Sequence, residues 1–250
     1  MRPRAEYAVL AIVLACADPI LPRGGIPTLD DRGADGFSTI SAGKEHSCAL
    51  TVDGTAFCWG SNEFGQLGTA SDDAKCFRED RPIACRRAPR PVNTTLVFKR
   101  IAAGGSHTCG LGNDDRVYCW GDNLHGAIGD PNVRTAPTPT AVLTSERFVD
   151  VVAGGSHSCA LRGDGAAFCW GENTDGQLGL AVVGNGTTVP TQAQTSQRFA
   201  SLAAGQRRTC ARVPDGTTYC WGATWVQRRN TTEVTRSQGS PSRVLGAMGS

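Results

Sequence analysis

The sequence is poor in aromatic residues and in net charge. Aromatic residues make up 6% of the 250, and 25 Lys and Arg face 23 Asp and Glu, so the formal net charge is +2. Nucleic-acid-binding proteins present a basic face, so this balance gives no reason to expect a nucleic-acid partner. Beyond residue 16 no apolar run approaches the ~20 residues needed to span a membrane. Few aromatics together with 31 glycines argue against a protein of long helices.

Catalytic signatures are also missing from the sequence. It contains no G-x-S-x-G, no H-E-x-x-H, no G-x-x-x-x-G-K-[ST] and no C-x-x-C. We therefore expect a protein that is not an enzyme and that needs neither a cofactor nor a metal. Apolar residues nevertheless make up 40%, which excludes intrinsic disorder and leaves enough to bury a core.

The first sixteen residues resemble an export signal. Two early arginines precede an apolar run at 7–15, which is too short for a membrane span and suits a signal-peptide core. The V-L-A-C ending at Cys16 resembles a bacterial lipobox, in which Cys16 becomes the lipidated first residue of the mature chain. An A-x-A site before Asp18 is an alternative, as is a short buried N-terminal strand or helix.

Residues 17–37 follow with three prolines, four glycines and no periodicity, which is typical of a linker. Together with the leader, this segment predicts an extracytoplasmic protein. It would be a lipoprotein of the cell envelope or surface, attached to the membrane by its lipid, or a secreted protein.

Four internal repeats follow the linker. Their segments align without gaps at 40–60, 101–121, 151–171 and 202–222, and each holds two cysteines ten residues apart. The first repeat is longer because of an insertion at 71–90, which carries the extra pair Cys76 and Cys85. Self-similarity at this period indicates a repeat architecture.

Each repeat predicts a β-hairpin around a three-residue turn. In the first repeat the turn centres on 52–54, and a type I turn followed by a left-handed residue suits the Asp-Gly there. That loop places Cys48 directly opposite Cys58, with Cα atoms about 4.5–5.5 Å apart and within reach of a disulfide. The same count pairs Cys109 with Cys119, Cys159 with Cys169, and Cys210 with Cys220.

The cysteine count supports a disulfide framework. Setting Cys16 aside leaves ten cysteines, which form four hairpin pairs plus Cys76–Cys85 and so imply an oxidising compartment. Zinc binding through His46, Cys48 and their copies is an alternative, as are free buried thiols. The fourth repeat, however, has Arg208 at the histidine position, and no fourth ligand recurs.

The repeat motifs resemble the regulator-of-chromosome-condensation repeat. They read A-G-x-x-H-S-C-A-L, then D-G-x-x-x-C-W-G, then S-N-E-F-G-Q-L-G at 61–68 or E-N-T-D-G-Q-L-G at 172–179. That family folds as a β-propeller with about 50 residues per blade. The resemblance implies an all-β, β-propeller-type array of about four blades with disulfide-stapled hairpins. It covers roughly 38–90, 91–140, 141–190 and 191–245.

The resemblance also shapes expectations for ring closure. A full ring of the family has seven blades, so four repeats imply an open arc or an incomplete ring that self-association could complete. The tail at 240–244 resembles the proline-and-valine segments at 89–92 and 137–142. We interpret these as the strand that begins each next blade, so the chain ends as if a fifth blade were starting.

The recurring aromatic and imidazole side chains are interpreted as structural. The tryptophan after each second cysteine should pack between blades, and the histidine two residues before the first cysteine of the first three repeats should make a structural hydrogen bond. Recurring turn aspartates are explained by the turns themselves. The tryptophans are Trp59, Trp120, Trp170 and Trp221, and the histidines are His46, His107 and His157.

Residues that occur only once are better candidates for binding. The stapled insertion carries Arg78, Arg81, Arg86 and Arg87, and a constrained loop with exposed arginines favours contact with a partner. A solvated surface excursion is the alternative. A second, weaker candidate is the group Arg207, Arg208, Arg228 and Arg229.

The sequence therefore predicts an exported module that binds a protein or a polysaccharide without catalysis. A protein inhibitor of a secreted enzyme is a second hypothesis. A guanine-nucleotide exchange factor is a third, because the eukaryotic namesake of the family has that activity. Export and disulfides argue against the third, since that protein works inside cells.

Overall fold

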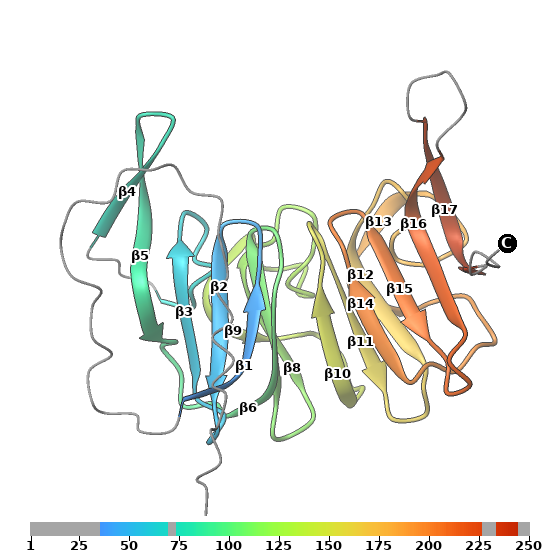
Figure 1. The fold of residues 1–250 in the computed structure, drawn as a ribbon, viewed down its shortest axis with the longest axis horizontal. Helices are drawn as coiled ribbons and strands as arrows, with labels where there is room; N and C mark the ends of the chain where they lie inside the picture. Colours follow the sequence, from blue (N-terminus) through green and yellow to red (C-terminus); the bar gives the residue numbers. More distant parts are fainter. Residues whose placement is uncertain (1–35, 70–73, 227–233, 245–250) are drawn as a thin grey trace, which may run out of the picture. The chain divides into compact units, whose positions relative to one another are not determined.

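The fold was analysed in a computed structural model, which describes residues 36–69, 74–226 and 234–244. These residues belong to one compact unit that starts at Gly33. The predicted export signal, with Cys16, and nearly all of the predicted linker lie outside them. The described residues form seventeen β-strands and no helix (Figure 1). This part of the chain therefore contains no helix that could cross a membrane.

The strands form four antiparallel sheets that follow one another in chain order (Figure 1). The first sheet, in the order β1-β2-β3-β5-β4, comprises β1 (Phe37–Ala42), β2 (His46–Thr51), β3 (Ala56–Ser61), β4 (Ala74–Arg78) and β5 (Arg81–Pro91). The second comprises β6 (Phe98–Ala103), β7 (His107–Gly112), β8 (Val117–Asp122) and β9 (Thr135–Ala141). The third comprises β10 (Phe148–Ala153), β11 (His157–Arg162), β12 (Ala167–Asn173) and β13 (Gly184–Gln192). The fourth comprises β14 (Ser201–Ala204), β15 (Arg208–Arg212), β16 (Thr218–Val226) and β17 (Val234–Arg243).

The predicted hairpin register is confirmed in every repeat. In the first, Thr51 N donates to Thr55 O at 3.0 Å, and Gly54 lies in the left-handed region with φ of 84°. Asp115 occupies the same position in the second repeat with φ of 63°. Asp is among the few residues with a side chain that tolerate this conformation, because its short polar side chain bonds locally.

Five disulfides staple the sheets. The four hairpin pairs are directly opposed, as the sequence predicts, and their Cα atoms are 4.0–4.1 Å apart, closer than expected. Cys76–Cys85 differs, because its Cα atoms are 5.8 Å apart and Cys76 lies opposite Ile83 instead. It therefore joins β4 to β5 diagonally. The sulfurs that a zinc site would need are bonded to one another.

Neighbouring sheets are joined by the predicted tryptophans and histidines. Trp120 is fully buried and donates from Nε1 to Gln66 O of the preceding sheet at 3.0 Å. The Thr108 hydroxyl donates to the same carbonyl at 2.8 Å, and it therefore accepts from His46 Nε2, also at 2.8 Å. All three contacts recur at the next junction, with His107, Ser158 and Trp170. At the last junction the bonds of His157 and Thr209 recur, whereas Trp221 Nε1 is buried without a hydrogen-bond partner among the described residues. The three histidines and three of the four tryptophans are therefore structural, as expected. Trp59, in the first sheet, is the exception: no preceding sheet of the described chain covers it, and it is only half-buried.

One expectation about the strand order is wrong. The proline-and-valine segments do not begin the next blade, because each one ends the strand that pairs with the third strand of its own sheet: β5, β9 and β17. In the fourth sheet, Tyr219 pairs with Arg243 and Cys220 with Ser242, so residues 240–243 complete β17. The sequence pattern of such a strand is the same whichever sheet it joins, so its sheet is known only from its pairing with the third strand in the structure.

Candidate binding face

The two ends of the sheets differ in what they present. We call one end the loop face. It holds the turns at 43–45, 104–106, 154–156 and 205–207 and the loops at 62–69, 123–134 and 174–183. The other end, the hairpin face, holds the stapled turns at 52–55, 113–116, 163–166 and 213–217. The hairpin face repeats one turn four times, whereas the loop face carries the features that occur once.

The insertion is a hairpin that belongs to the first sheet. β5 pairs with β3 from Phe57–Pro91 to Ser61–Cys85, and β4 extends the sheet by one more strand. The tip between β4 and β5 rises at the loop face (Figure 1). Both residues at the tip, Glu79 and Asp80, have positive φ, 46° and 63°. Neither is glycine, so the tip is strained and is held by its surroundings.

Ion pairs fasten this hairpin to the loop face. Arg78 pairs with Glu45 and, at 3.0 Å, with Glu63, and Arg81 pairs with Glu63. Glu45 is next to the turn residue Lys44, and Glu63 belongs to the loop after β3. Two of the four predicted binding arginines therefore contact the chain's own carboxylates.

The other two arginines lie further along β5. Arg86 donates from Nη2 to Thr69 Oγ1 at 3.1 Å, whereas Arg87 is exposed. The opposite side of the hairpin carries Phe77, which is 71% exposed and lies across from the exposed Pro82. Strand alternation puts Phe77 and Arg78 on opposite sides. Sequence reasoning singled out the arginines and missed this phenylalanine.

A glycine-lined cleft of about 620 Å³ opens at the loop face, where the four short turns converge. A Cβ on Gly105 would lie 2.3 Å from Gly155 O, and one on Gly104 would lie 2.6 Å from Gly154 O, so the close approach of neighbouring turns requires glycine. The amides of these turns bond across the junctions, for example Gly155 N to Gln206 O at 3.0 Å. Three charged side chains complete the lining: Lys44, Glu172 and Arg207.

Arg207 is held in place by a buried carboxylate. Its Nε is 2.5 Å from Asp175 Oδ2, and the side chain of Asp175 is only 3% exposed. Ser237 donates to the other oxygen of Asp175 at 3.1 Å. Among the described residues the Nη atoms of Arg207 donate no hydrogen bond. The other members of the weaker arginine group do not join it: Arg208 is half-buried, and Arg228 and Arg229 lie outside the described residues.

A second cleft, of about 670 Å³, separates the loops of the second and third sheets. Its lining includes His125, Arg134, Thr188 and, again, Glu172. Glu172 thus borders both clefts, and its Oε1 accepts from Thr174 Oγ1 at 2.9 Å. Both volumes fall within the range of ligand-binding pockets, roughly 300–1,000 Å³.

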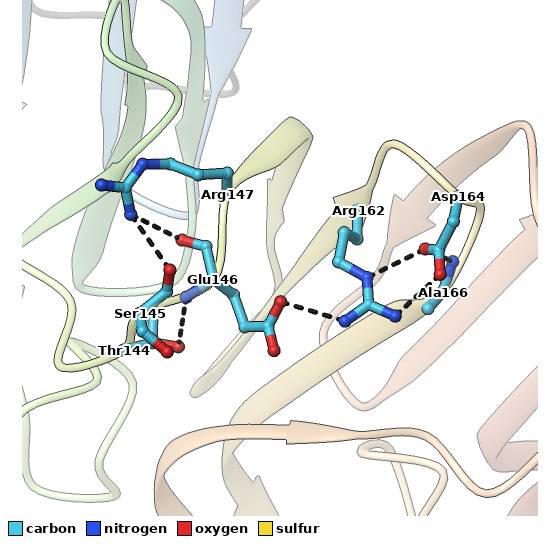
Figure 2. Close-up of polar contacts among 7 residues, drawn as sticks. All are labelled: Thr144, Ser145, Glu146, Arg147, Arg162, Asp164 and Ala166. Carbon is cyan, nitrogen blue, oxygen red and sulfur yellow. Dashed lines mark hydrogen bonds and ion pairs between the residues drawn. The ribbon is translucent and has the colours of Figure 1, made fainter.

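The hairpin face, by contrast, carries charges that are paired locally. Asp164 accepts from Ala166 N at 3.1 Å and from both Nε and Nη2 of Arg162, which also reaches Glu146 at 3.0 Å (Figure 2). Arg162 holds the pKa of Asp164 well below its usual range. The recurring turn aspartates therefore serve their turns, as expected. Among the described residues no cluster of three or more His, Cys, Asp or Glu could hold a metal ion.

The fold and this face define a class of protein. Antiparallel sheets, each stapled within its hairpin and joined to the next by one tryptophan and one imidazole, form a β-propeller-type repeat array in an open arrangement. The chain belongs to the family of the Regulator of chromosome condensation (RCC1) repeat. One family model matches residues 37–66, 98–127 and 148–177, and another matches 53–111, 114–161 and 164–212.

Curated relatives match only part of the chain. The human probable E3 ubiquitin-protein ligase HERC4 is 33% identical over 100 residues, which is 39% of this chain and 9% of HERC4. The human E3 ubiquitin-protein ligase HERC2 is 31% identical over 116 residues, which is 46% of this chain and 2% of HERC2. The chain therefore matches less than a tenth of either relative.

Solved structures confirm the fold. Prp20p from Saccharomyces cerevisiae superposes with a TM-score of 0.69 at 23% identity, covering 89% of this chain and 52% of Prp20p. Human WBSCR16 gives a TM-score of 0.66 at 22% identity, covering 82% of this chain and 51% of WBSCR16. The chain spans about half the length of each of these structures. The RCC1-repeat fold supports a protein-binding module.

Proposed function

We propose that this chain is an exported, non-catalytic binding module that contacts a protein or a polysaccharide through its loop face. The observation that carries the proposal is the division between the two faces. The hairpin face repeats one turn, whereas the loop face gathers the insertion hairpin, both clefts and a strained tip. Binding residues need not repeat, and strained, rigidly supported loops are typical of recognition sites.

Export and anchoring complete the proposal. Five disulfides suit an oxidising compartment, and the leader ending at Cys16 has the features of a lipobox. The similar Prp20p was characterised for its binding properties to Gsp1p and histones, which favours a protein as the partner. A protein inhibitor of a secreted enzyme would use the same face. Guanine-nucleotide exchange would need reduced thiols and a cytosolic chain.

Site-specific photo-crosslinking in the native host tests this proposal. A benzophenone side chain at Phe77 on the loop face should crosslink one discrete partner. The matched control places it at Val52 on the hairpin face, which is 72% exposed against 71% for Phe77. Equal yields of the same product from both positions, or none from Phe77, would contradict binding through the loop face.

The intact mass of the same preparation tests export. We expect a chain without residues 1–15, with a lipid on Cys16 and ten thiols that react only after reduction. A full-length chain with all eleven thiols free would contradict export and favour the exchange-factor alternative.

A further inference from the structure

We infer that the glycine-lined cleft is a carboxylate-binding site that takes an acidic peptide segment of the partner protein. The inference rests on the proposed function and names the chemistry of the partner. It starts from the two cations of the cleft. Lys44 comes from the turn between β1 and β2, and Arg207 comes from the turn between β14 and β15, so the first and the fourth sheet each contribute one.

The glycine amides that line this cleft are already engaged in hydrogen bonds. Lys44 N donates to Gly104 O at 3.1 Å, and Gly105 N donates to Gly154 O at 3.0 Å. These amides join one sheet to the next and are not available to a ligand. The charged groups that the cleft offers to a ligand are the side chains of Lys44, Glu172 and Arg207.

Arg207 is preorganised for an anion. The buried carboxylate of Asp175 fixes its Nε, which leaves the planar Nη pair of the guanidinium for a ligand. That fork matches the two oxygens of a carboxylate, and a guanidinium held by a second group loses little entropy on binding. Asp175 takes the place of Phe64 and His125 in the earlier repeats, so this device occurs only at the fourth sheet.

Lys44 is the second cation, and it has no competing structural role. It is exposed, and its ammonium makes no ion pair or hydrogen bond with the described residues. Glu172 and the buried Asp175 behind Arg207 match the two cations in number. The attraction for an anion therefore comes from the two cationic groups that face the cleft, the ammonium of Lys44 and the Nη pair of Arg207, and Glu172 weakens it.

The volume of the glycine-lined cleft suits a peptide segment better than a small ion. About 620 Å³ is far larger than one carboxylate needs, and the lining is mostly backbone of glycine, alanine and serine. An extended peptide fits such a surface, with separate acidic side chains meeting Lys44 and Arg207. Glu172 also lines the second cleft, so it borders the place where a longer segment would leave the first.

Titration of the purified, disulfide-bonded chain with a synthetic hexaglutamate peptide at low salt tests the inference. We expect saturable binding that weakens as salt is added, and no binding of hexaglutamine. Lys44→Gln should weaken binding about threefold and Arg207→Gln about tenfold, whereas Glu172→Gln should strengthen it about threefold. Arg147→Gln, on the hairpin face (Figure 2), is the control and should change nothing.

Lys44→Gln and Glu172→Gln are expected to change affinity in opposite directions, so misfolding of a variant cannot account for both results. Arg207→Gln leaves the buried Asp175 without its cation and could disturb the fourth sheet, but Lys44→Gln and Glu172→Gln remove no such contact. Absence of hexaglutamate binding, equal binding of hexaglutamine, or unchanged affinity in both Lys44→Gln and Glu172→Gln overturns the inference. Competition by equimolar inorganic phosphate also overturns it, because it indicates a site for any small anion.

This result is independent of the test of the proposed function. Hexaglutamate binding together with no crosslinked partner at Phe77 would reject the proposed function and keep the cleft. A crosslinked partner together with no hexaglutamate binding would reject the cleft and keep the loop face.

Discussion

At the residue scale, the three junction histidines make the fold sensitive to acid. Burial lowers the pKa of His46 to about 3, of His107 to about 4 and of His157 to about 3. Their Nε2 atoms donate to hydroxyls that themselves donate to carbonyls, and the lowered pKa values keep each imidazole neutral at pH 7. Nδ1 of His46 and of His157 is buried without a partner, and a proton there would have no acceptor.

We expect stability to fall by about 2 kcal/mol per histidine between pH 7 and pH 5. The unfolded chain binds protons at its ordinary pKa of 6.5, whereas the fold resists them until about pH 4. Stability is therefore fully present above pH 6.5 and is lost as the pH falls below it. Urea unfolding midpoints at both pH values measure the loss.

His107→Gln should remove about a third of that pH dependence. It should also lower stability at pH 7 by about 1–3 kcal/mol, because the hydroxyl of Ser158 loses its donor. The matched control is His125→Gln at the exposed histidine, which should leave the pH profile unchanged. A wild-type midpoint that does not change between pH 7 and pH 5 would show that the junctions accept the charged imidazole.

At the scale of elements, the disulfides differ in what they hold together. Cys109 and Cys119 are fully buried between sheets, whereas Cys76 is half-buried and joins the edge strand β4 to β5. The Cys109→Ala/Cys119→Ala double variant should therefore lose about 2–5 kcal/mol of global stability. Cys76→Ser/Cys85→Ser should lose less, because ion pairs from Arg78 and Arg81 still fasten the tip.

Loss of the Cys76–Cys85 disulfide should instead change the local stability of the β4–β5 hairpin. We expect the Cys76→Ser/Cys85→Ser variant to be cleaved at Glu79 by a glutamate-specific protease many times faster than the wild type, with little change in melting temperature. Limited proteolysis followed by mass spectrometry measures this. Equal cleavage rates would mean that the ion pairs alone hold the hairpin, and a large fall in melting temperature would make β4 part of the core.

The strands also show how much of the fold can be predicted from the sequence. The hairpin register follows from three turn residues and a cysteine spacing of ten, all local, so Cys48 and Cys58 were predicted to face each other and do. The role of β5 depends on its pairing with β3, which no local pattern encodes. The ion pairs of the predicted binding arginines could not be predicted for the same reason. Glu45 and Glu63 are distant from Arg78 in the sequence, and only the folded sheet brings them together.

At the scale of the whole array, the first sheet differs from the others in what covers it. Trp120, Trp170 and Trp221 are at most 1% exposed, because a preceding sheet packs over each of them. Trp59 is only half-buried, and Ile40 on the same sheet is 58% exposed. The first sheet thus shows an apolar surface of the kind that the three later sheets bury against a neighbour.

We expect this surface to drive self-association of the described array. Each internal junction buries a tryptophan and satisfies a hydroxyl, so a second copy that covers Trp59 and Ile40 gains part of the same free energy. Sedimentation velocity at increasing concentration should show a rising mean mass. Ile40→Glu should weaken association at least tenfold, since it places a charge in the interface. Val182→Glu, at a loop residue that is 70% exposed, should not. A constant monomer mass at all concentrations, or equal association of both variants, would contradict self-association through the first sheet.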